Sequence, residues 1–202
     1  MREKQPGRDD RRVRRTHAAV RGALVDLIIE RGWDGFSVQD LCERADIGRS
    51  TFYLHFADKE EVVAGAFADL GKALRAQLAR SGASRPLDFS RGLLDHAQEH
   101  LRVYRALVGR RAAQVIQGKM RALVFDLVRE DVDARLPPGA RRDAVAAFLA
   151  GALFEVRFWS LEARPPTTAE AADALFHELA APALAAGTAR VGRGPPGRPP
   201  GA

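Results

Sequence analysis

The chain has 202 residues and a formal net charge of +6, and 46% of its residues are hydrophobic. This composition excludes a fully disordered chain and allows one or two domains with buried cores. The single cysteine, Cys42, excludes a disulfide framework and a CxxC metal site. The N-terminus has no apolar signal segment, and no apolar stretch approaches the roughly 18 residues of a membrane span, so a cytoplasmic protein is expected. The sequence pI of about 10.2 favours a polyanionic partner.

The first part of the chain is predicted to be an arm followed by a long helix. Residues 1–12 are polar and charged, and we expect them to form a flexible basic arm. Apolar residues recur at helical spacing from Val13 to Arg31, and Gly32 is expected to end that helix. The following segment, "GWDGF", reads as a turn that carries Trp33 and Phe36 back into the core.

Two short helices are predicted next. Ser37, with Asp40 three residues later, forms an N-cap of the capping-box type for the first of them. A turn is expected at Asp46 to Gly48, where aspartate and glycine tolerate left-handed or capping conformations. The second short helix should span Arg49 to Phe56, with its two phenylalanines one turn apart and facing the core.

The rest of the chain also follows helical periodicity, and no strand pattern is evident. Asp58 is expected to cap a helix that runs to about Arg80, and the predicted helices beyond it span residues 89–108, 112–136, 141–163 and 167–185, the last kinked or ended near Pro182. The predicted fold is therefore all-α, with a three-helix helix-turn-helix domain and a C-terminal helical bundle. The expected domains are residues 1–12 (arm), 13–58 (helix-turn-helix, linked through 59–80), 81–187 (bundle) and 188–202 (disordered Pro/Gly/Arg tail).

The segment "IGRSTFYLHFADKEEV" surrounds two buried phenylalanines with hydrogen-bond donors, which suits DNA. In a helix-turn-helix the second short helix enters the major groove. Arg49 at its start suits guanine acceptors, and Thr51 or Leu54 can meet thymine methyl groups. The side chains of Tyr53, His55 and Lys59 suit phosphate oxygens.

The run "FSVQDLCERADIGRSTFYLHFADKEEVV", with the helix before it, resembles the DNA-binding region of the TetR family of bacterial transcriptional regulators over about residues 13–70. The most specific part is the run from Thr51 to Lys59. Asp46 stands where the family usually has glycine, and Gly48 where it often has a capping serine. The resemblance implies base-facing positions at Gln39, Arg49, Ser50 and Leu54, phosphate contacts at Ser37, Thr51, Tyr53, His55 and Lys59, and a turn at Gly48.

The resemblance further implies that the C-terminal domain dimerises and holds an effector pocket. Aromatic and polar candidates for a pocket that takes an apolar small molecule are His96, His100, Tyr104, Met120, Phe125, Phe154, Phe158 and Trp159. The last two helices could pair with their copies in a four-helix bundle of two-fold symmetry, although packing within one chain is the alternative. Candidate interface residues are Ala147, Phe148, Gly151, Ala152, Leu175, Phe176 and Leu179.

The function predicted from the sequence is that of a homodimeric repressor released from a palindromic operator by a small-molecule effector. A regulator, repressor or activator, controlled by a protein partner is the alternative, because "VYRALVG" and "FLAGALFEVRFWSLE" resemble a C-terminal type found in some TetR-like regulators. An enzyme is not expected, since no P-loop, GxSxG or HExxH motif occurs. His96 and His100 could share a metal, but no third ligand was evident, so no metal or cofactor is predicted. An adaptor that binds protein or membrane is disfavoured by the position of the positive charge.

Overall fold

The structure, a computed structural model, describes residues 6–81, 85–107, 111–165 and 167–188. These residues contain helices and connecting turns and no strand, which confirms the all-α prediction. The helices are α1 (Pro6–Arg31), α2 (Val38–Arg44), α3 (Arg49–His55), α4 (Lys59–Ser81), α5 (Ser90–Glu99), α6 (Leu101–Leu107), α7 (Arg111–Arg135), α8 (Ala140–Glu162) and α9 (Ala169–Thr188), with a short 3-10 helix at Trp33–Gly35.

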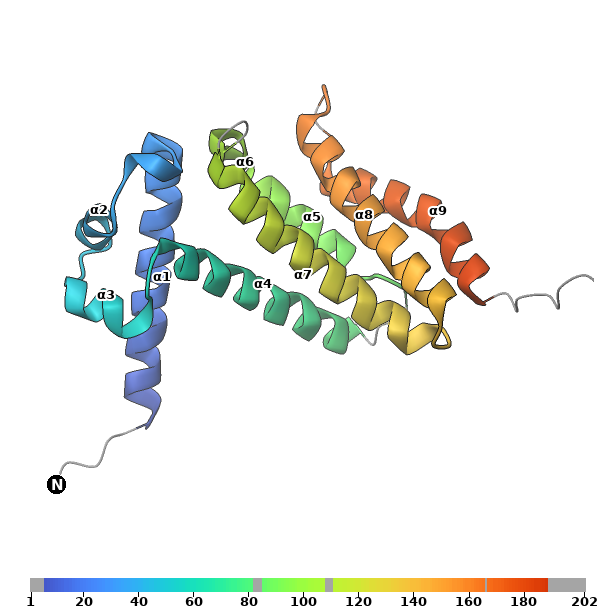
Figure 1. Cartoon of the computed structure of the whole chain (residues 1–202), viewed down its shortest axis with the longest axis horizontal. Coiled ribbons are helices and arrows are strands. Elements are labelled where there is room, and N and C mark those ends of the chain that lie inside the picture. The colour runs from blue at the N-terminus through green and yellow to red at the C-terminus, as the bar shows by residue number, and fades with distance from the viewer. Residues whose placement is uncertain (1–5, 82–84, 108–110, 166, 189–202) are drawn as a thin grey trace, which may run out of the picture.

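The N-terminal helices form a small unit with its own core. In Figure 1, α2 and α3 lie beside the long α1, and α4 runs from this unit toward the other helices. Trp33 and Phe36 are buried in this core, as the sequence predicts, because the backbone turns at Gly32 with a φ of 72°. The remaining core residues are Val20, Ala23, Leu24, Leu27, Ile28, Leu41, Cys42, Ala45, Phe52, Phe56, Val62 and Val63.

The C-terminal helices form a second, larger body. α8 packs between α7 and α9, α5 packs on α9, and α4 connects to the body through α7. The core between them is aliphatic and aromatic, with Leu93, Leu127, Leu149 and Phe176 almost fully buried. Burial of these side chains holds the body together, at roughly 1.5–3 kcal/mol for each large apolar side chain.

Helix α1 begins earlier than the sequence predicts. Its first residue is Pro6, so residues 6–12 are helical where a flexible arm was expected. Proline suits the first position of a helix because its missing N–H would have no partner there, and arginine is a good helix former. The described side chains at Arg11 and Arg12 are exposed. The predicted C-terminal tail lies outside the described residues from 189 onward.

The helix predicted over residues 89–108 is two helices. The backbone of His100 (φ −100°, ψ 19°) ends α5, and α6 begins at the next residue. α5 packs on α8 and α9 of the body, whereas α6 packs mainly on α1. The chain must therefore change direction between the two cores. A second difference is that α9 continues through Pro182 to Thr188 rather than ending there.

One described helix, α8, is long and apolar enough to cross a membrane by length and composition. Half of the relevant window is buried inside the chain's own fold. A core helix passes the same test, so α8 does not indicate a membrane protein.

Candidate nucleic-acid interface and adjoining cavity

The start of α2 is fixed by a reciprocal cap. The Ser37 side chain accepts a hydrogen bond from the Asp40 backbone N–H at 3.2 Å, and Asp40 accepts from the Ser37 backbone N–H at 2.8 Å. Arg31, at the end of α1, also donates to Asp40 at 2.9 Å. Hydrogen bonds from Ser37, supported by Arg31, lower the pKa of Asp40 to about 2. The predicted capping box is confirmed, and it joins α2 to α1.

The turn between α2 and α3 lies where the sequence predicts it. Asp46 adopts the left-handed conformation with a φ of 52°, and the Ile47 N–H donates to the Cys42 carbonyl at 3.0 Å. Gly48 occupies the N-cap of α3 in an extended conformation and offers no side-chain cap. Arg49 is therefore the first residue of α3, at the end of the helix that is expected to reach base edges.

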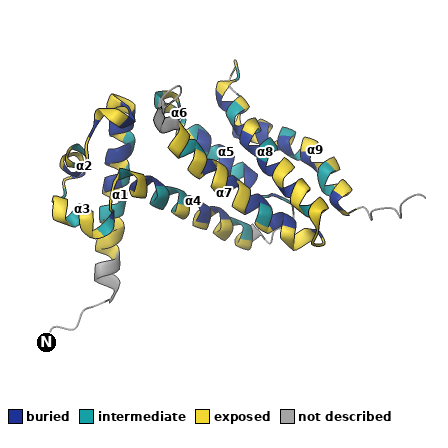
Figure 2. Cartoon of the chain, viewed as in Figure 1, coloured by how far each residue is buried: buried dark blue, intermediate teal, exposed yellow. Residues whose placement is uncertain are grey.

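Helix α3 has one buried side and one exposed side. Phe52 and Phe56 are buried in the N-terminal core, whereas Tyr53 is 52% and Leu54 73% exposed. Arg49 and Ser50 are also exposed, and Figure 2 shows α3 as largely exposed on its outer side. This surface, which we call the α3 face, consists of Arg49, Ser50, Tyr53 and Leu54. Thr51 and His55 are partly buried at its edges, and the exposed Gln39 donates to Glu43 at 3.0 Å.

Lys59 has internal partners. Its ammonium donates to the carbonyls of Trp33 at 2.7 Å and Phe36 at 3.2 Å, and lies 4.7 Å from the centre of each of their rings. The sequence analysis assigned Lys59 to phosphate, but in the structure its ammonium links the start of α4 to the turn before α2. The His55 ring packs at 5.2 Å from the ring of His17 in α1.

The comparisons with known proteins agree with this geometry. Residues 22–66 match the model of "Bacterial regulatory proteins, tetR family", a span that contains α2, α3 and the turn between them. By this match the chain resembles the TetR family of regulators over its DNA-binding region. Its relatives include the HTH-type transcriptional regulator TcmR of Streptomyces glaucescens, 27% identical over 125 residues, which are 61% of this chain and 51% of TcmR. The regulator YxbF of Bacillus subtilis is 40% identical over 55 residues, 27% of this chain and 14% of YxbF. These matches thus span about half, or less, of the curated relatives.

Solved structures of TetR-family regulators share the fold of this chain. A regulator from Syntrophomonas wolfei has a TM-score of 0.64 at 16% identity, covering 87% of this chain and 97% of its own. A regulator from Streptococcus agalactiae has a TM-score of 0.56 at 22% identity, covering 85% and 97%. At these identities the similarity establishes the fold.

A cavity of about 440 Å³ lies between the N-terminal unit and the body. Its walls come from α1, α4, α5, α6, α7 and α8, and four of the predicted pocket residues, His96, His100, Tyr104 and Met120, line it. The other four do not. Phe125 and Trp159 are exposed, Phe154 is buried beside the cavity, and Phe158 stacks on Phe154 at 4.9 Å.

The cavity residue that the sequence analysis missed on α8 is Arg157. The sequence prediction of the pocket rested on aromatic and polar side chains of other types, and did not include an arginine within an apolar helix. Its position one turn after Phe154 places it against the wall, where its guanidinium lies 5.0 Å from the Phe154 ring and 4.2 Å from the Phe158 ring. A charged residue within an apolar helical stripe is the signal that could have identified it.

The predicted interface residues divide into exposed and buried groups. Phe148 is 59% and Leu179 58% exposed, Ala147 is exposed, and Gly151, Ala152 and Leu175 are partly exposed. Phe176 is corrected from interface to core, because it is only 1% exposed and packs in the body's own core. Periodicity alone could not separate it from its neighbours Leu175 and Leu179.

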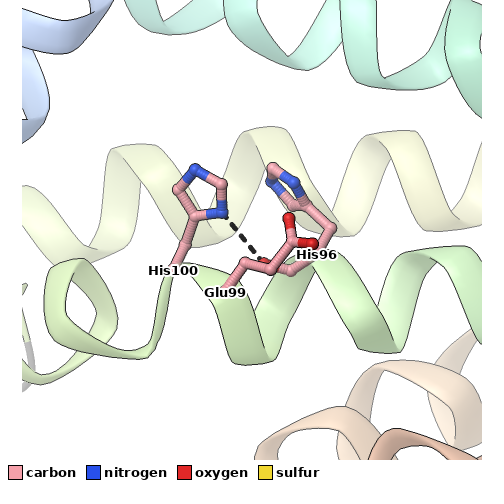
Figure 3. A group of neighbouring side chains, drawn as sticks. All are labelled: His96, Glu99 and His100. Atoms are coloured by element: carbon pink, nitrogen blue, oxygen red, sulfur yellow. Dashed lines mark hydrogen bonds between the residues drawn. The ribbon is translucent and has the colours of Figure 1, made fainter.

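Figure 3 shows His96, Glu99 and His100, whose potential ligand atoms lie within 4.8 Å of one another. Glu99 is the third candidate ligand of this group, which the sequence alone did not indicate. Burial, with smaller effects of His100 and Arg157, lowers the pKa of His96 to about 4. The positive charge of Arg157 that disfavours a proton there also disfavours a metal cation, and Glu99 and His100 are exposed. We therefore assign no metal to this group.

Proposed function

We propose that the chain is a cytoplasmic, homodimeric DNA-binding repressor whose α3 face reads an operator and whose cavity takes a small-molecule effector. The observation that carries this proposal is the α3 face itself. Four exposed side chains, including Tyr53 and Leu54, stand on a short helix whose opposite side is anchored by two buried phenylalanines. A helix held in this way can enter the major groove without losing its support.

On DNA, Arg49 is the base-reading residue of the α3 face. It stands at the helix N-terminus and its side chain is exposed, so its guanidinium can form paired hydrogen bonds with guanine. Ser50 and Leu54 lie beside it, while the Tyr53 hydroxyl can donate to a phosphate. Lys59 contributes by holding the turn and α4 in place.

Each chain carries one α3 face, so two such faces on one operator require a pair of chains. The apolar stripe of α8 at Phe148, Gly151, Ala152 and Trp159, together with Leu179 of α9, is the surface that two copies would bury. Two-fold pairing through this stripe would present two recognition helices about one DNA turn, ~34 Å, apart, which selects a palindromic operator.

The cavity offers a route from effector to DNA. Leu24 and Ile28 of α1 line it together with Phe67 of α4 and Met120 of α7, so one ligand would contact both units. The ion pair between Arg21 of α1 and Asp69 of α4, at 2.6 Å, also lies on its wall. A ligand that binds better to one arrangement of α1 against α4 would shift the population away from the arrangement that fits the operator.

The test is selection of bound duplexes from a random DNA pool with the full chain at two salt concentrations. A palindrome with half-sites about one turn apart and a steep salt dependence is expected. Arg49→Ala should lower affinity for the selected duplex and relax its sequence preference, by about 1–3 kcal/mol at the affected base pair. Arg141→Ala, which removes an exposed arginine of α8, is the matched control. Sequence-blind binding by the wild type, or an unchanged preference in Arg49→Ala, would contradict the assigned face.

A further inference from the structure

Arg157 is a buried cation on the cavity wall. It is 5% exposed, in the last third of α8, and its Nε has no hydrogen-bond partner. In the described part of the chain its guanidinium forms no ion pair, and the neighbouring acid Glu155 pairs with Arg121 at 3.8 Å instead. Among the described residues its guanidinium lies against the rings of Phe154 and Phe158.

A buried charge without a partner is costly, because it loses its hydration and gains nothing in return. Burial lowers the pKa of Arg157 to about 10, so the group still carries its proton at neutral pH. Ring stacking stabilises the guanidinium by roughly 2 kcal/mol. It leaves the buried Nε–H donor without a hydrogen bond. The side chain is therefore prepared for an acceptor that comes from outside the chain.

A second unsatisfied donor belongs to the same cavity wall. Within the described ranges, three buried side-chain nitrogens have no hydrogen-bond partner, and two of them, on Arg157 and Arg21, belong to residues of the cavity wall. The third, Nε of Arg142, lies 3.0 Å from the Asp133 carboxylate. Arg21 uses one nitrogen for Asp69 and keeps its Nε free of a hydrogen bond.

The acidic and hydroxyl groups near the cavity are already engaged. Asp69 accepts from Arg21 at 2.6 Å and from Lys72 at 3.1 Å, and the Tyr104 hydroxyl donates to Glu162 at 2.7 Å. The other side chains on the wall are mostly apolar: Leu24, Val25, Ile28, Val63, Phe67, Leu70, Val103, Ile116 and Met120. The cavity thus combines an apolar wall with two arginines, Arg21 and Arg157, whose buried Nε atoms lack hydrogen bonds.

We propose that this cavity binds an amphipathic organic anion, with its charged group on Arg157 and its apolar part against α1, α4 and α7. The inference rests on the proposed function and deepens it, because it names the chemical class of the effector. The cavity of about 440 Å³ is within the usual range for small-molecule sites. A neutral ligand would exclude water from Arg157 without satisfying it, and a cationic ligand would meet like charge.

A pair of fluorescent probes tests the charge requirement in the wild-type chain. 8-Anilinonaphthalene-1-sulfonate and N-phenyl-1-naphthylamine share their rings, but only the first carries an anionic group. Titration of the full chain should give tighter binding of the sulfonate, by about 10-fold or more, as expected for hydrogen bonds to a charged group. Equal or tighter binding of the neutral probe would overturn the proposal.

Variants locate the site. Arg157→Met should weaken sulfonate binding by about 10-fold or more and change binding of the neutral probe by less than about 3-fold. Arg121→Met is the matched control, because Arg121 also stacks on the Phe154 ring, at 4.2 Å, but is exposed and is not on the cavity wall. Unchanged sulfonate affinity in folded Arg157→Met would overturn the assignment, and would point to binding on an exposed apolar surface.

Circular dichroism shows whether Arg157→Met folds. If this variant does not fold, Arg157→Lys takes its place, because it keeps the charge and should retain the preference for the sulfonate. Loss of that preference in folded Arg157→Lys would count against the site. The DNA selection described above is an independent readout. Charge-selective binding without operator recognition would remove the proposed regulator and leave the anion site. Operator recognition without charge-selective binding would leave the proposed regulator and remove the anion site.

Discussion

Lys59 joins the two sides of the N-terminal core. Its ammonium donates hydrogen bonds to the Trp33 and Phe36 carbonyls, which lie in the turn that leads into α2. We expect Lys59→Met to lower the free energy of unfolding by about 1.5–3 kcal/mol, the usual effect of hydrogen bonds to charged groups. Urea denaturation followed by circular dichroism measures this change.

Lys119→Met is the control for this variant, because Lys119 is an exposed residue of α7, and its removal should change stability by less than about 0.5 kcal/mol. If Lys59→Met instead leaves stability unchanged and weakens DNA binding equally for all sequences, Lys59 is a phosphate contact and not a structural link.

Asp173 is the acidic centre of a second residue cluster, which ties α9 to α5. Its carboxylate accepts hydrogen bonds from the Ser90 hydroxyl and, at 2.8 Å, from the Arg85 guanidinium. It also lies 3.5 Å from Nε2 of His177. Burial alone would raise the pKa of Asp173, but hydrogen bonds from His177, Ser90 and Arg85 outweigh it and lower the pKa to about 2. Because the folded pKa is below the unfolded one, this stabilisation is present above pH 3.8 and is lost as the pH falls toward 2.

Asp173→Asn is therefore expected to reduce stability at pH 7 by about 1.5–3 kcal/mol, since it replaces the buried carboxylate that accepts hydrogen bonds from Ser90 and Arg85. Below pH 3.8 the gap between wild type and variant should narrow, by up to about 2 kcal/mol. Urea denaturation at pH 7, 4 and 3 gives the two stabilities, with the exposed Asp126→Asn as control. A gap that does not depend on pH would show that the carboxylate charge is not responsible.

At the scale of elements, α3 begins without a side-chain cap. Gly48 has φ −69° and ψ 148°, suitable for an N-cap, and a Cβ there would come no closer than 3.7 Å to its neighbours. A serine could therefore accept a hydrogen bond from the first turn of α3. We expect Gly48→Ser to be more stable than Gly48→Ala by about 1 kcal/mol, measured as a difference in thermal unfolding. Equal melting of the two variants would contradict a capping role for this position.

The sequence predicts most elements because their apolar stripes repeat over several turns. Helices α7 and α8 begin and end within one residue of their predicted limits. The end of α5 at His100 has no glycine or proline to indicate it, because the chain turns there in response to two separate cores. The helical start at Pro6 was also missed, since charged residues do not form an apolar stripe.

For the molecule as a whole, the local sequence pattern predicted which residues form the α3 face. It did not predict which groups Lys59 and Arg157 contact. Spacing alone places Phe52 inward and Tyr53 outward, and the structure agrees. Lys59 and Arg157 could not be predicted in the same way, because their surroundings come from distant segments, the turn at Trp33 in one case and the walls of α1 and α4 in the other. A motif indicates which residue type stands at a position, whereas the partners of that residue depend on how distant segments of the chain pack together.

Helices α8 and α9 expose large apolar side chains, because Phe148, Trp159 and Leu179 are each about half exposed or more. Exposed apolar side chains that gather on one side of a protein commonly mark an interface. We expect Phe148→Asp to shift the chain from dimer to monomer in analytical ultracentrifugation, because a buried unpaired carboxylate in the interface is costly. Phe125→Asp, at an exposed phenylalanine of α7, is the control and should leave the dimer intact.

The same variant connects assembly with DNA binding. Since each chain carries one α3 face, a monomer can occupy only one half-site and loses the gain in effective concentration that the second half-site provides, a factor of about 10² or more in affinity. Phe148→Asp should therefore bind a duplex with a single half-site with the same affinity as one wild-type chain. It should bind the full palindrome at least about 100-fold more weakly than the wild type does. Gel-shift titration on both duplexes measures the two affinities. Equal affinity of variant and wild type for the palindrome would mean that the two faces do not act together through this surface.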